Sequence, residues 1–296
     1  MSELTLVVVF LAQVVRIGVP YFFAAAGGVL SERVGVIALS LEGYMLTGAF
    51  CTALGAYYSG SPGIGLLCGR AGRMLSALIL AVATVRFRAD NVVAGIAINL
   101  LAIGATRFFQ RLTFDSSSNS PRVPGFGGDA PGGGALATLA SPLVLMGVVA
   151  LPILAFVLYR TPFGLRARAV GEHPQAAATV GVPVQRIRYL GVLASGALAG
   201  LAGAYLATDQ HQFTDGMTAG RGFIALAAVI FGRWDPKRVL FACVLFAAAE
   251  TLQIRLQGLG LVPSQFVEMI PYVLTIVALA GVVGRSVPPA SLGKVE

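Results

Sequence analysis

FGLRARAVGEHPQAAATVGVPVQRIRY, residues 163–189, is a basic stretch rich in glycine and alanine, and it lies between two long apolar runs. Loops between membrane spans that carry arginine and lysine stay on the cytoplasmic side, so this stretch predicts a membrane protein with a cytoplasmic loop here. Pro174 suits the first turn of a helix, residues 175–178 are helix formers, and Gly181 and Pro183 are typical of a helix end. We therefore predict a short helix beneath a bundle of spans. From charge alone, an ordinary solvated loop explains the stretch equally well.

The composition around this stretch excludes a soluble domain. Mean hydropathy is +0.82, 56% of the residues are hydrophobic and 11% are charged, against about 25% charged residues in ordinary globular proteins. Residues 43–69, 130–159 and 189–208 carry no Asp, Glu, Lys or Arg, and each run reaches the ~20 residues that a helix needs to cross a bilayer. Because the alternating pattern of barrel strands is absent, the sequence predicts an all-α, polytopic helical membrane protein.

The chain divides into one transmembrane domain, residues 1–285, and a tail, residues 286–296, for which Pro288 and Pro289 favour disorder in the cytoplasm. The first apolar run lacks a basic leader, which indicates a retained helix. Residues 222–232 are too short to cross alone and are a candidate half-helix. We expect eight or nine spans from these apolar segments: residues 4–30, 34–58, 64–85, 91–110, 141–159, 189–208, 222–232, 239–254 and 266–284.

The distribution of basic residues gives an orientation. With residues 163–189 inside and the spans alternating, most arginines and both lysines fall on the inside, as the positive-inside rule requires. The amino terminus then faces outward if all nine segments cross. The smaller outside set consists of Arg107, Arg111, Arg122, Arg221 and Arg255.

Residues 164–184, GLRARAVGEHPQAAATVGVPV, resemble the coupling loop of ATP-binding-cassette (ABC) importer permeases. More specifically, the chain is similar to the permeases for nucleosides and simple sugars that work with a basic membrane lipoprotein, a family related to branched-chain amino acid and ribose permeases. Three further stretches match this family: SERVGVIALSLEGYMLTGAF at 31–50, RADNVVAGIAINLLA at 88–102 and GRGFIALAAVIFGRWDP at 220–236. The resemblance covers residues 27–284. It departs at Ala38 and Ser40, where Asn and Gly are expected, and at 68–74, which is more basic than the family pattern.

The resemblance implies a permease subunit that translocates nucleosides, or else simple sugars, across the bacterial cytoplasmic (inner) membrane. It implies four associates: an ABC ATPase subunit, a second homologous permease, an extracytoplasmic solute-binding lipoprotein and membrane lipid. The ATPase would dock on the loop residues Ala169, Val170, Gly171, Glu172, Ala176, Ala177 and Gly181. From the residues themselves, Glu172 is equally suited to capping the helix that begins at Pro174.

Polar side chains inside apolar segments are the candidate solute-pathway residues. A carboxylate in a span must face protein or water, so Glu42 either lines a pathway or belongs to a packing network; alternatively it pairs with Arg33 or caps a broken helix. Asn99 lies mid-segment and either joins helices by hydrogen bonds or contacts solute. Glu250 is suited to pairing with Arg255 or to contacting solute.

Other classes of function find little support. The only Gly-Lys pair, at 293–294, is followed by Val295, so the chain has no P-loop and ATP hydrolysis would need a separate subunit. The net charge of +8 is spread over the ends of apolar runs, which argues against a nucleic-acid partner. Three dispersed cysteines and two distant histidines predict neither a disulfide nor a metal site, and we expect no cofactor and no catalytic residue.

One enzymatic alternative rests on residues 215–221, DGMTAGR, which nearly match the D-G-x-x-A-R opening of CDP-alcohol phosphotransferases. Those enzymes need further aspartates on the same helix face to hold divalent metal ions, and residues 223–231 contain none. Gly196 and Gly200, with Gly203 close behind, are interpreted as a helix-packing face.

Overall fold

The computed structural model describes residues 3–116, 118–126, 141–259, 269, 273 and 287–294. These residues form helices joined by turns and short extended segments, and they contain no β-strand, which confirms the all-α prediction. The helices are α1 (Glu3–Arg33), α2 (Leu41–Ser59), α3 (Pro62–Ala81) with a π-helical turn (Val82–Arg86), α4 (Asn91–Phe114), α6 (Pro142–Arg160), α7 (Pro162–Glu172), α8 (Pro174–Thr179), α9 (Val184–Asp209), α10 (Arg221–Phe231) and α11 (Pro236–Leu259).

Six of the described helices are long and apolar enough to cross a membrane: α1, α3 with its π-helical turn, α4, α6, α9 and α11. The polytopic prediction is therefore confirmed. The predicted segment 222–232 corresponds to α10, which has 11 residues and is too short to cross. The last predicted segment, residues 266–284, lies outside the described residues, so the count of eight or nine spans stays a prediction.

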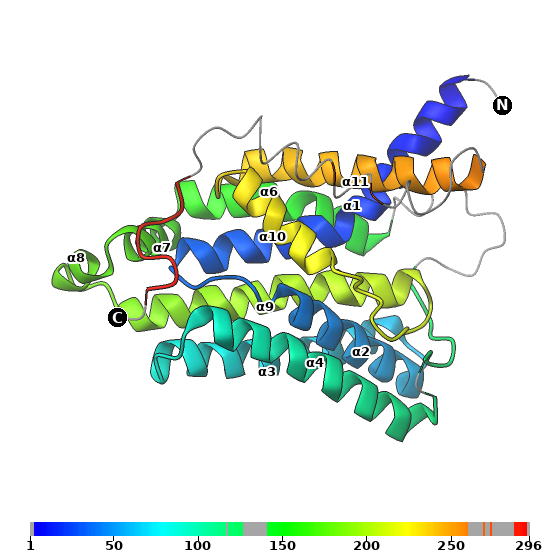
Figure 1. Ribbon diagram of the computed structural model, residues 1–296, viewed down its shortest axis with the longest axis horizontal. Coiled ribbons are helices and arrows are strands. Elements are labelled where there is room, and N and C mark those ends of the chain that lie inside the picture. The colour runs from blue at the N-terminus through cyan, green and yellow to red at the C-terminus, as the bar shows by residue number, and fades with distance from the viewer. Residues whose placement is uncertain are drawn as a thin grey trace.

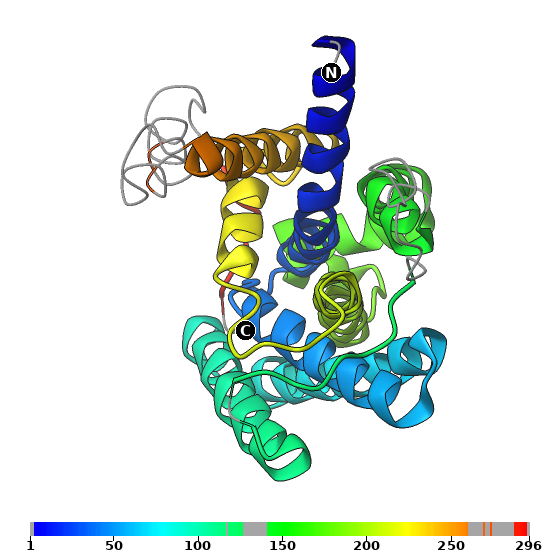
Figure 2. The ribbon, with the colours of Figure 1, turned by 90° about the vertical axis from the view of Figure 1, so that its right-hand side faces the viewer.

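The helices run roughly along the long axis of the molecule (Figure 1). Helices α7 and α8 and the described part of the tail lie at one end, which we call the α8 end. The amino terminus lies near the other end. The α8 end also contains the connections between longer helices at 86–91, 160–184 and 231–236. Most of the basic segments predicted to face inward therefore lie at this one end. Viewed along the axis, α9 lies in the middle of the bundle, in contact with α1, α2 and α3 (Figure 2).

Two helices, α2 and α10, begin in the middle of the bundle (Figure 1). Helix α1 ends in a Schellman motif, because Gly35 takes φ = +91° and the N–H groups of Gly35 and Val36 bond back to the carbonyls of Glu32 and Ser31. Residues 34–40 are then non-helical, and α2 begins only at Leu41. The predicted apolar segment 34–58 is therefore non-helical over 34–40 and helical over 41–58. Helix α2 runs from the middle of the bundle away from the α8 end, whereas α10 runs from the middle toward it (Figure 1).

The glycine face predicted on α9 lies against α2 and α3. A methyl group at Gly203 would overlap the carbonyl oxygen of Met45, and one at Gly196 would overlap the side chain of Ala77. Gly200 accommodates the stem of Arg73, an α3 residue that is 4% exposed and whose Nε and Nη1 have no hydrogen-bond partner in the described part of the chain. Close backbone approach of this kind is how small residues hold membrane helices together.

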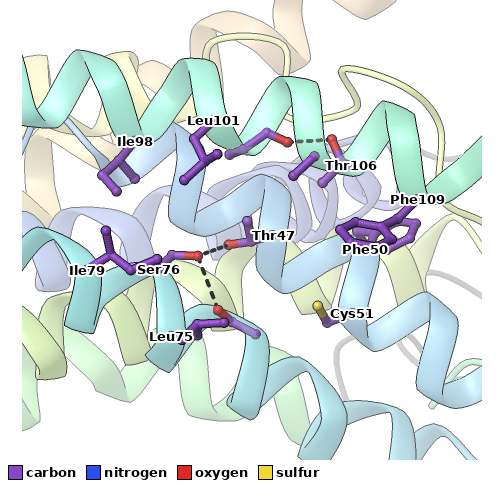
Figure 3. Close-up of a pocket in the computed structure, with 13 residues that line it drawn as sticks. Thr47, Phe50, Cys51, Leu75, Ser76, Ile79, Ile98, Leu101, Thr106 and Phe109 are labelled. Atoms are coloured by element: carbon purple, nitrogen blue, oxygen red, sulfur yellow. Dashed lines mark hydrogen bonds between the residues drawn. The ribbon is translucent and has the colours of Figure 1, made fainter.

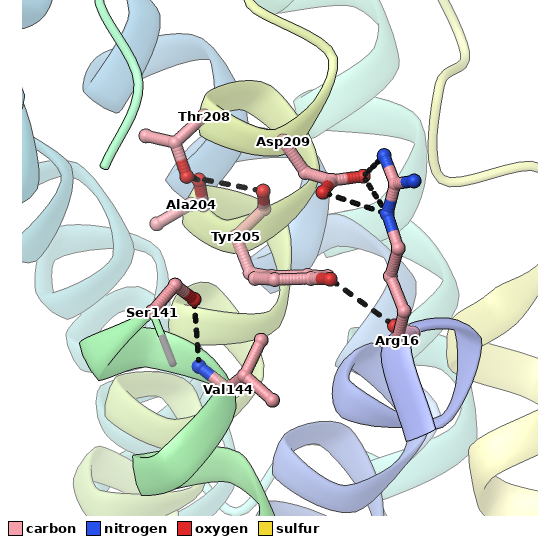
Figure 4. A network of polar contacts seen from close by, with 7 residues as sticks. All are labelled: Arg16, Ser141, Val144, Ala204, Tyr205, Thr208 and Asp209. Carbon is pink, nitrogen blue, oxygen red and sulfur yellow. Dashed lines mark hydrogen bonds and ion pairs between the residues drawn. The ribbon is translucent and has the colours of Figure 1, made fainter. Parts of the chain in front are cut away.

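Helix α9 is also tied to α1 at the end opposite α8 (Figure 4). The Arg16 guanidinium pairs with Asp209, with 3.0 Å between Nε and Oδ1, and the Tyr205 hydroxyl donates to the Arg16 carbonyl at 3.2 Å. In the same region Ser141 caps α6 by accepting the N–H of Val144 at 3.3 Å. These contacts hold α1 against α9 through Arg16.

Candidate functional site: a surface at the α8 end and a polar junction in the middle

The basic stretch that opened the sequence analysis forms two helices. Thr161 caps α7 by accepting the N–H of Gly164 at 3.2 Å, with Pro162 in the first turn. The predicted helix after Pro174 is α8, and it ends in a second Schellman motif at Gly181, where φ is +81°. The short helix is therefore confirmed, and the residues before it, which the sequence left unassigned, form a helix as well.

The seven predicted docking residues divide into two groups. Ala169, Glu172, Ala176 and Gly181 are exposed, whereas Val170, Gly171 and Ala177 are buried. Val170 and Ala177 pack in a small apolar cluster with Val34, Ala167 and Ile187. Gly171 must be small because a methyl group there would overlap the carbonyl oxygen of Arg33. The smallness of Gly171 thus serves contact with α1, and only the exposed group presents a surface to a partner.

Glu172 does not cap α8, because no side chain accepts from the first turn of that helix. That interpretation of Glu172 is wrong. Its Oε2 accepts the N–H of Ala290 at 3.2 Å, and its Oε1 lies 4.0 Å from Nη1 of Arg33. The Glu172 side chain is 48% exposed, so the ion pair is weak. Glu172 therefore joins α7 to the end of α1 and to the tail.

The described part of the tail, residues 287–294, is ordered against this surface, which corrects the expected disorder. Ser291 is 2% exposed; its N–H donates to the Gly171 carbonyl at 2.9 Å, and its hydroxyl lies 2.7 Å from the same oxygen. The Gly293 N–H donates to the Gly35 carbonyl at 3.0 Å. A cleft of about 250 Å³ lies between the tail and α8, lined by Glu172, His173, Pro174, Gln175, Ala176, Ala290, Ser291 and Lys294.

The end of α1 also holds the turn between α10 and α11. The Arg33 guanidinium donates to the Trp234 carbonyl from Nε at 3.1 Å and from Nη2 at 2.9 Å. The Trp234 indole N–H donates to the buried carboxylate of Glu32. Arg233 and Trp234 both have positive φ, 52° and 57°, as the turn reverses direction. Arg33 therefore contacts α7 through Gly171 and Glu172, and it contacts the end of α10 through Trp234.

Glu42 connects the two half-helices in the middle of the bundle. Its Oε1 accepts the Thr218 hydroxyl at 2.6 Å and the Gly220 N–H at 2.9 Å, and its Oε2 accepts the Gly222 N–H at 2.7 Å. Helix α10 has no cap from its own sequence, so Glu42 supplies acceptors for its first-turn N–H groups from another helix. Of the two structural interpretations, the cap of a broken helix fits these contacts and the pairing with Arg33 is wrong.

Asn99 stabilises the start of α2 from α4. Its Nδ2 donates to the Leu39 carbonyl at 2.8 Å, and its Oδ1 accepts the Gly43 N–H at 2.8 Å. Both polar atoms of the amide are thereby used within the chain. Glu42 and Asn99 are far apart in sequence, but both form hydrogen bonds at the start of α2, where the non-helical residues 34–40 end.

A second charged group lies next to this junction and was not predicted. Arg221, the first residue of α10, pairs with Glu250 of α11 at 2.8 Å, and the Tyr21 hydroxyl of α1 donates to the same carboxylate. Arg221 is therefore inside the bundle and not in an outer loop, and of the two alternatives for Glu250, pairing with Arg255 is wrong. Arg255 instead lies near Gln13 and over the ring of Phe10. The sequence signal that could have identified Arg221 was its position as a charged residue directly before the short apolar run 222–232.

A groove of about 220 Å³ lies between α2, α3 and α4 (Figure 3). In its wall the Ser76 hydroxyl donates to the Thr47 hydroxyl at 3.2 Å and the Thr106 hydroxyl donates to the Ala102 carbonyl at 2.7 Å, so these three hydroxyls are already bonded within the chain. Apolar side chains form the rest of the labelled wall, among them Phe50, Ile98, Leu101 and Phe109. Such a groove fits an apolar occupant.

The described residues do not provide the metal site of the enzymatic alternative. Asp215, the aspartate of the near-match, pairs with Arg107 at 2.8 Å. Within the described ranges, no group of three or more His, Cys, Asp or Glu side chains is placed to hold a metal ion. The DGMTAGR stretch instead forms the turns that lead into α10.

Residues 10–279 match the model of the family described as branched-chain amino acid transport system / permease component. The guanosine ABC transporter permease protein NupQ of Bacillus subtilis is 40% identical, over 93% of this chain and 92% of the relative. The nucleoside ABC transporter permease protein NupC of Lactococcus lactis is 35% identical, over 96% and 95%. The putative glucose ABC transporter permease protein TsgC13 of Haloferax volcanii is 36% identical, over 80% and 74%.

Proposed function

Because the chain belongs to the family of permease components of branched-chain amino acid transport systems, we propose that it is the permease subunit of an ABC importer that translocates nucleosides. It is a multi-pass protein of the cytoplasmic membrane and a transport component, not an enzyme. The observation that carries the nucleoside assignment is the 40% identity to a guanosine permease over nearly the whole length of both chains. A second nucleoside permease at 35% identity supports the same solute class.

In this proposal the α8 end is cytoplasmic and the exposed residues of α7 and α8 receive a separate ATPase subunit, which hydrolyses the ATP. The support is the pair of short helices projecting from the bundle, in which Ala169, Glu172, Ala176 and Gly181 are exposed. A second, homologous permease completes the translocation pathway, and an extracytoplasmic lipoprotein delivers solute at the opposite end. Val170, Gly171 and Ala177 contribute to docking indirectly, by holding α7 and α8 against α1 and α9.

We assign the solute pathway to the neighbourhood of the half-helix junction. Discontinuous helices that meet near the middle of the membrane are a common way to build a solute site in transporters. Glu42 and Asn99 have their polar atoms bonded within the chain, so we propose that they position the backbone of the pathway. A change at either residue then alters transport by moving the start of α2 or of α10.

A sugar is the second candidate solute, and one observation favours it: the relative from Haloferax volcanii is a putative glucose permease at 36% identity. A branched-chain amino acid is a further alternative that the family description raises. A nucleoside carries the hydroxyls of its ribose, and a sugar carries similar ring hydroxyls. A permease pathway that binds hydroxyls therefore accepts either class with few changes.

Uptake measurements in cells without their own nucleoside transport would test the proposal. The chain is co-expressed with its ATPase, its partner permease and its lipoprotein, and radiolabelled guanosine is supplied. We expect ATP-dependent uptake that unlabelled nucleosides inhibit and that glucose, ribose and leucine leave unchanged. Inhibition by a sugar alone would replace the nucleoside by a sugar, and uptake that persists without the ATPase would reject an ABC importer.

A further inference from the structure

We propose that the segment 287–294 is part of the surface that receives the ATPase, and that Lys294 pairs there with an acidic side chain of the ATPase. This inference rests on the proposed function. It adds a binding element that is distant in sequence from α7 and α8. The starting observation is the cleft of about 250 Å³, which has α8 as one wall and Ala290, Ser291 and Lys294 as the other.

The tail is held firmly enough to act as a wall. The N–H groups of Ala290, Ser291 and Gly293 donate to Glu172, Gly171 and Gly35, respectively. The turn closes on itself through the Lys294 N–H, which donates to the Ser291 carbonyl at 3.1 Å. Gly293 has φ = +74°, which favours glycine at that position. These bonds join three separate parts of the chain, so the segment has a defined position relative to α8.

The charges on the cleft indicate what it receives. Lys294 is exposed, and its ammonium forms no ion pair with any described residue. By contrast, the carboxylate of Glu172 across the cleft is already engaged by Ala290 and lies near Arg33. Of the described charged side chains that line the cleft, Lys294 is the one without a charged partner, and the group that complements it on a partner is a carboxylate. Because the ATPase is the partner proposed for α8, the same subunit is the one that reaches Lys294.

The lysines of this chain provide a sharp test, because it contains only two, Lys237 and Lys294. Both are exposed at the α8 end, Lys294 in the cleft and Lys237 at the start of α11. A carbodiimide joins a lysine amine directly to a carboxylate only when the two are in contact. The permease pair with its bound ATPase, in lipid nanodiscs, is treated with carbodiimide and the linked peptides are identified by mass spectrometry. We expect Lys294 linked to an Asp or Glu of the ATPase.

Affinity measurements on matched variants complete the test. Lys294→Glu should weaken binding of fluorescently labelled ATPase to the nanodisc-bound permease by about fivefold, the size of an exposed ion pair. Lys294→Arg should retain the affinity while losing the crosslink, because a guanidinium does not react. Lys237→Glu is the control and should change the affinity less than twofold. All three substitutions are at exposed positions, so the melting temperature of the permease should not change.

The outcomes separate the two proposals. If wild-type permease binds no ATPase, the proposed function itself fails. If wild type binds but the only crosslink is at Lys237, or Lys294→Glu binds as tightly as wild type, the tail is a structural support and this inference is overturned. A chain shortened to residue 286 distinguishes support from contact: loss of the support lowers the melting temperature, which Lys294→Glu should not do.

Discussion

Gly171 and Ala176 are both small residues of one basic loop, but Gly171 is buried and Ala176 is exposed. We therefore expect substitution of Gly171 to lower the stability of the permease, and substitution of Ala176 to impair contact with the ATPase. Ala176 is exposed on α8, so Ala176→Trp should leave the melting temperature of the permease unchanged. It should reduce uptake and solute-stimulated ATPase activity of the assembled transporter at least tenfold by holding the ATPase away. Wild-type stimulation in reconstituted vesicles would show that α8 is not a docking surface.

Gly171 is buried, so Gly171→Ala should act on the permease itself. The added methyl overlaps the carbonyl oxygen of Arg33, and overpacking of this kind costs about 1–3 kcal/mol. We expect a lower melting temperature of the isolated permease in detergent, measured against Ala176→Ser as a control at an exposed site. An unchanged melting temperature would mean that α7 can move away from α1 at little cost.

Glu42 makes a second prediction about a single side chain. Glu42→Gln replaces one acceptor oxygen by an N–H₂ group that cannot accept from the first turn of α10. Hydrogen bonds to a charged group are worth about 1.5–3 kcal/mol, so we expect a loss of stability in that range. Thr218→Val is the matched control: it removes one donor and keeps the carboxylate, and should cost less. Equal melting temperatures for Glu42→Gln and wild type would contradict the capping role.

Sequence reasoning identified Glu42 and Asn99 because a charge or an amide in an apolar segment is conspicuous. It could not identify what they bind. Thr218, Gly220 and Gly222 come from a segment that is remote in the chain, and two of the three donors are backbone N–H groups, which leave no trace in residue type. The actual partners of Arg33 and Ser291 were missed for the same reason, since they are mainly backbone atoms.

Among the helices, α9 depends on glycine for its close contact with α2. Gly203→Ala places a methyl group on the carbonyl oxygen of Met45 and should destabilise the bundle by about 1–3 kcal/mol. Gly104→Ala in α4 is the control, because no atom lies within 4 Å of the added methyl group. It should be neutral or raise stability by up to about 1 kcal/mol, since alanine favours helix. Thermal melting of both variants in detergent measures the difference.

Long helices were the part of the fold most accessible from sequence, and the breaks were the least. Apolar length alone predicts α4, α6, α9 and α11, because a span must be apolar throughout. Residues 34–40 are as apolar as the helix that follows them, so hydropathy joins them to α2. The break depends on Gly35 in a left-handed conformation and on hydrogen bonds from Asn99, and neither changes the hydropathy. The short length of α10 was visible because polar turns flank it.

For the molecule as a whole, the gathering of basic turns at the α8 end predicts its orientation. In a variant lacking Cys51, Cys68 and Cys243, a cysteine at Val180 should be protected from a membrane-impermeant thiol reagent in intact cells. A cysteine at Tyr58, at the far end of α2, should be labelled. Both side chains are well exposed, 78% and 70%, so access to the reagent depends only on the side of the membrane. The reverse pattern would invert the topology.

Helix α10 is attached at both ends: Arg33 and Glu32 hold the turn after it, and Glu42 holds its first residues. An 11-residue helix is about 16 Å long and does not shorten appreciably. We therefore expect a displacement of α7 that carries Arg33 with it to be transmitted through α10 to the start of α2. Such a rigid link makes two distant changes thermodynamically interdependent. Glu172→Gln and Thr218→Val, one near each end of the link, should then affect solute-stimulated ATPase activity non-additively, whereas unconnected sites would give the sum of their separate free-energy changes.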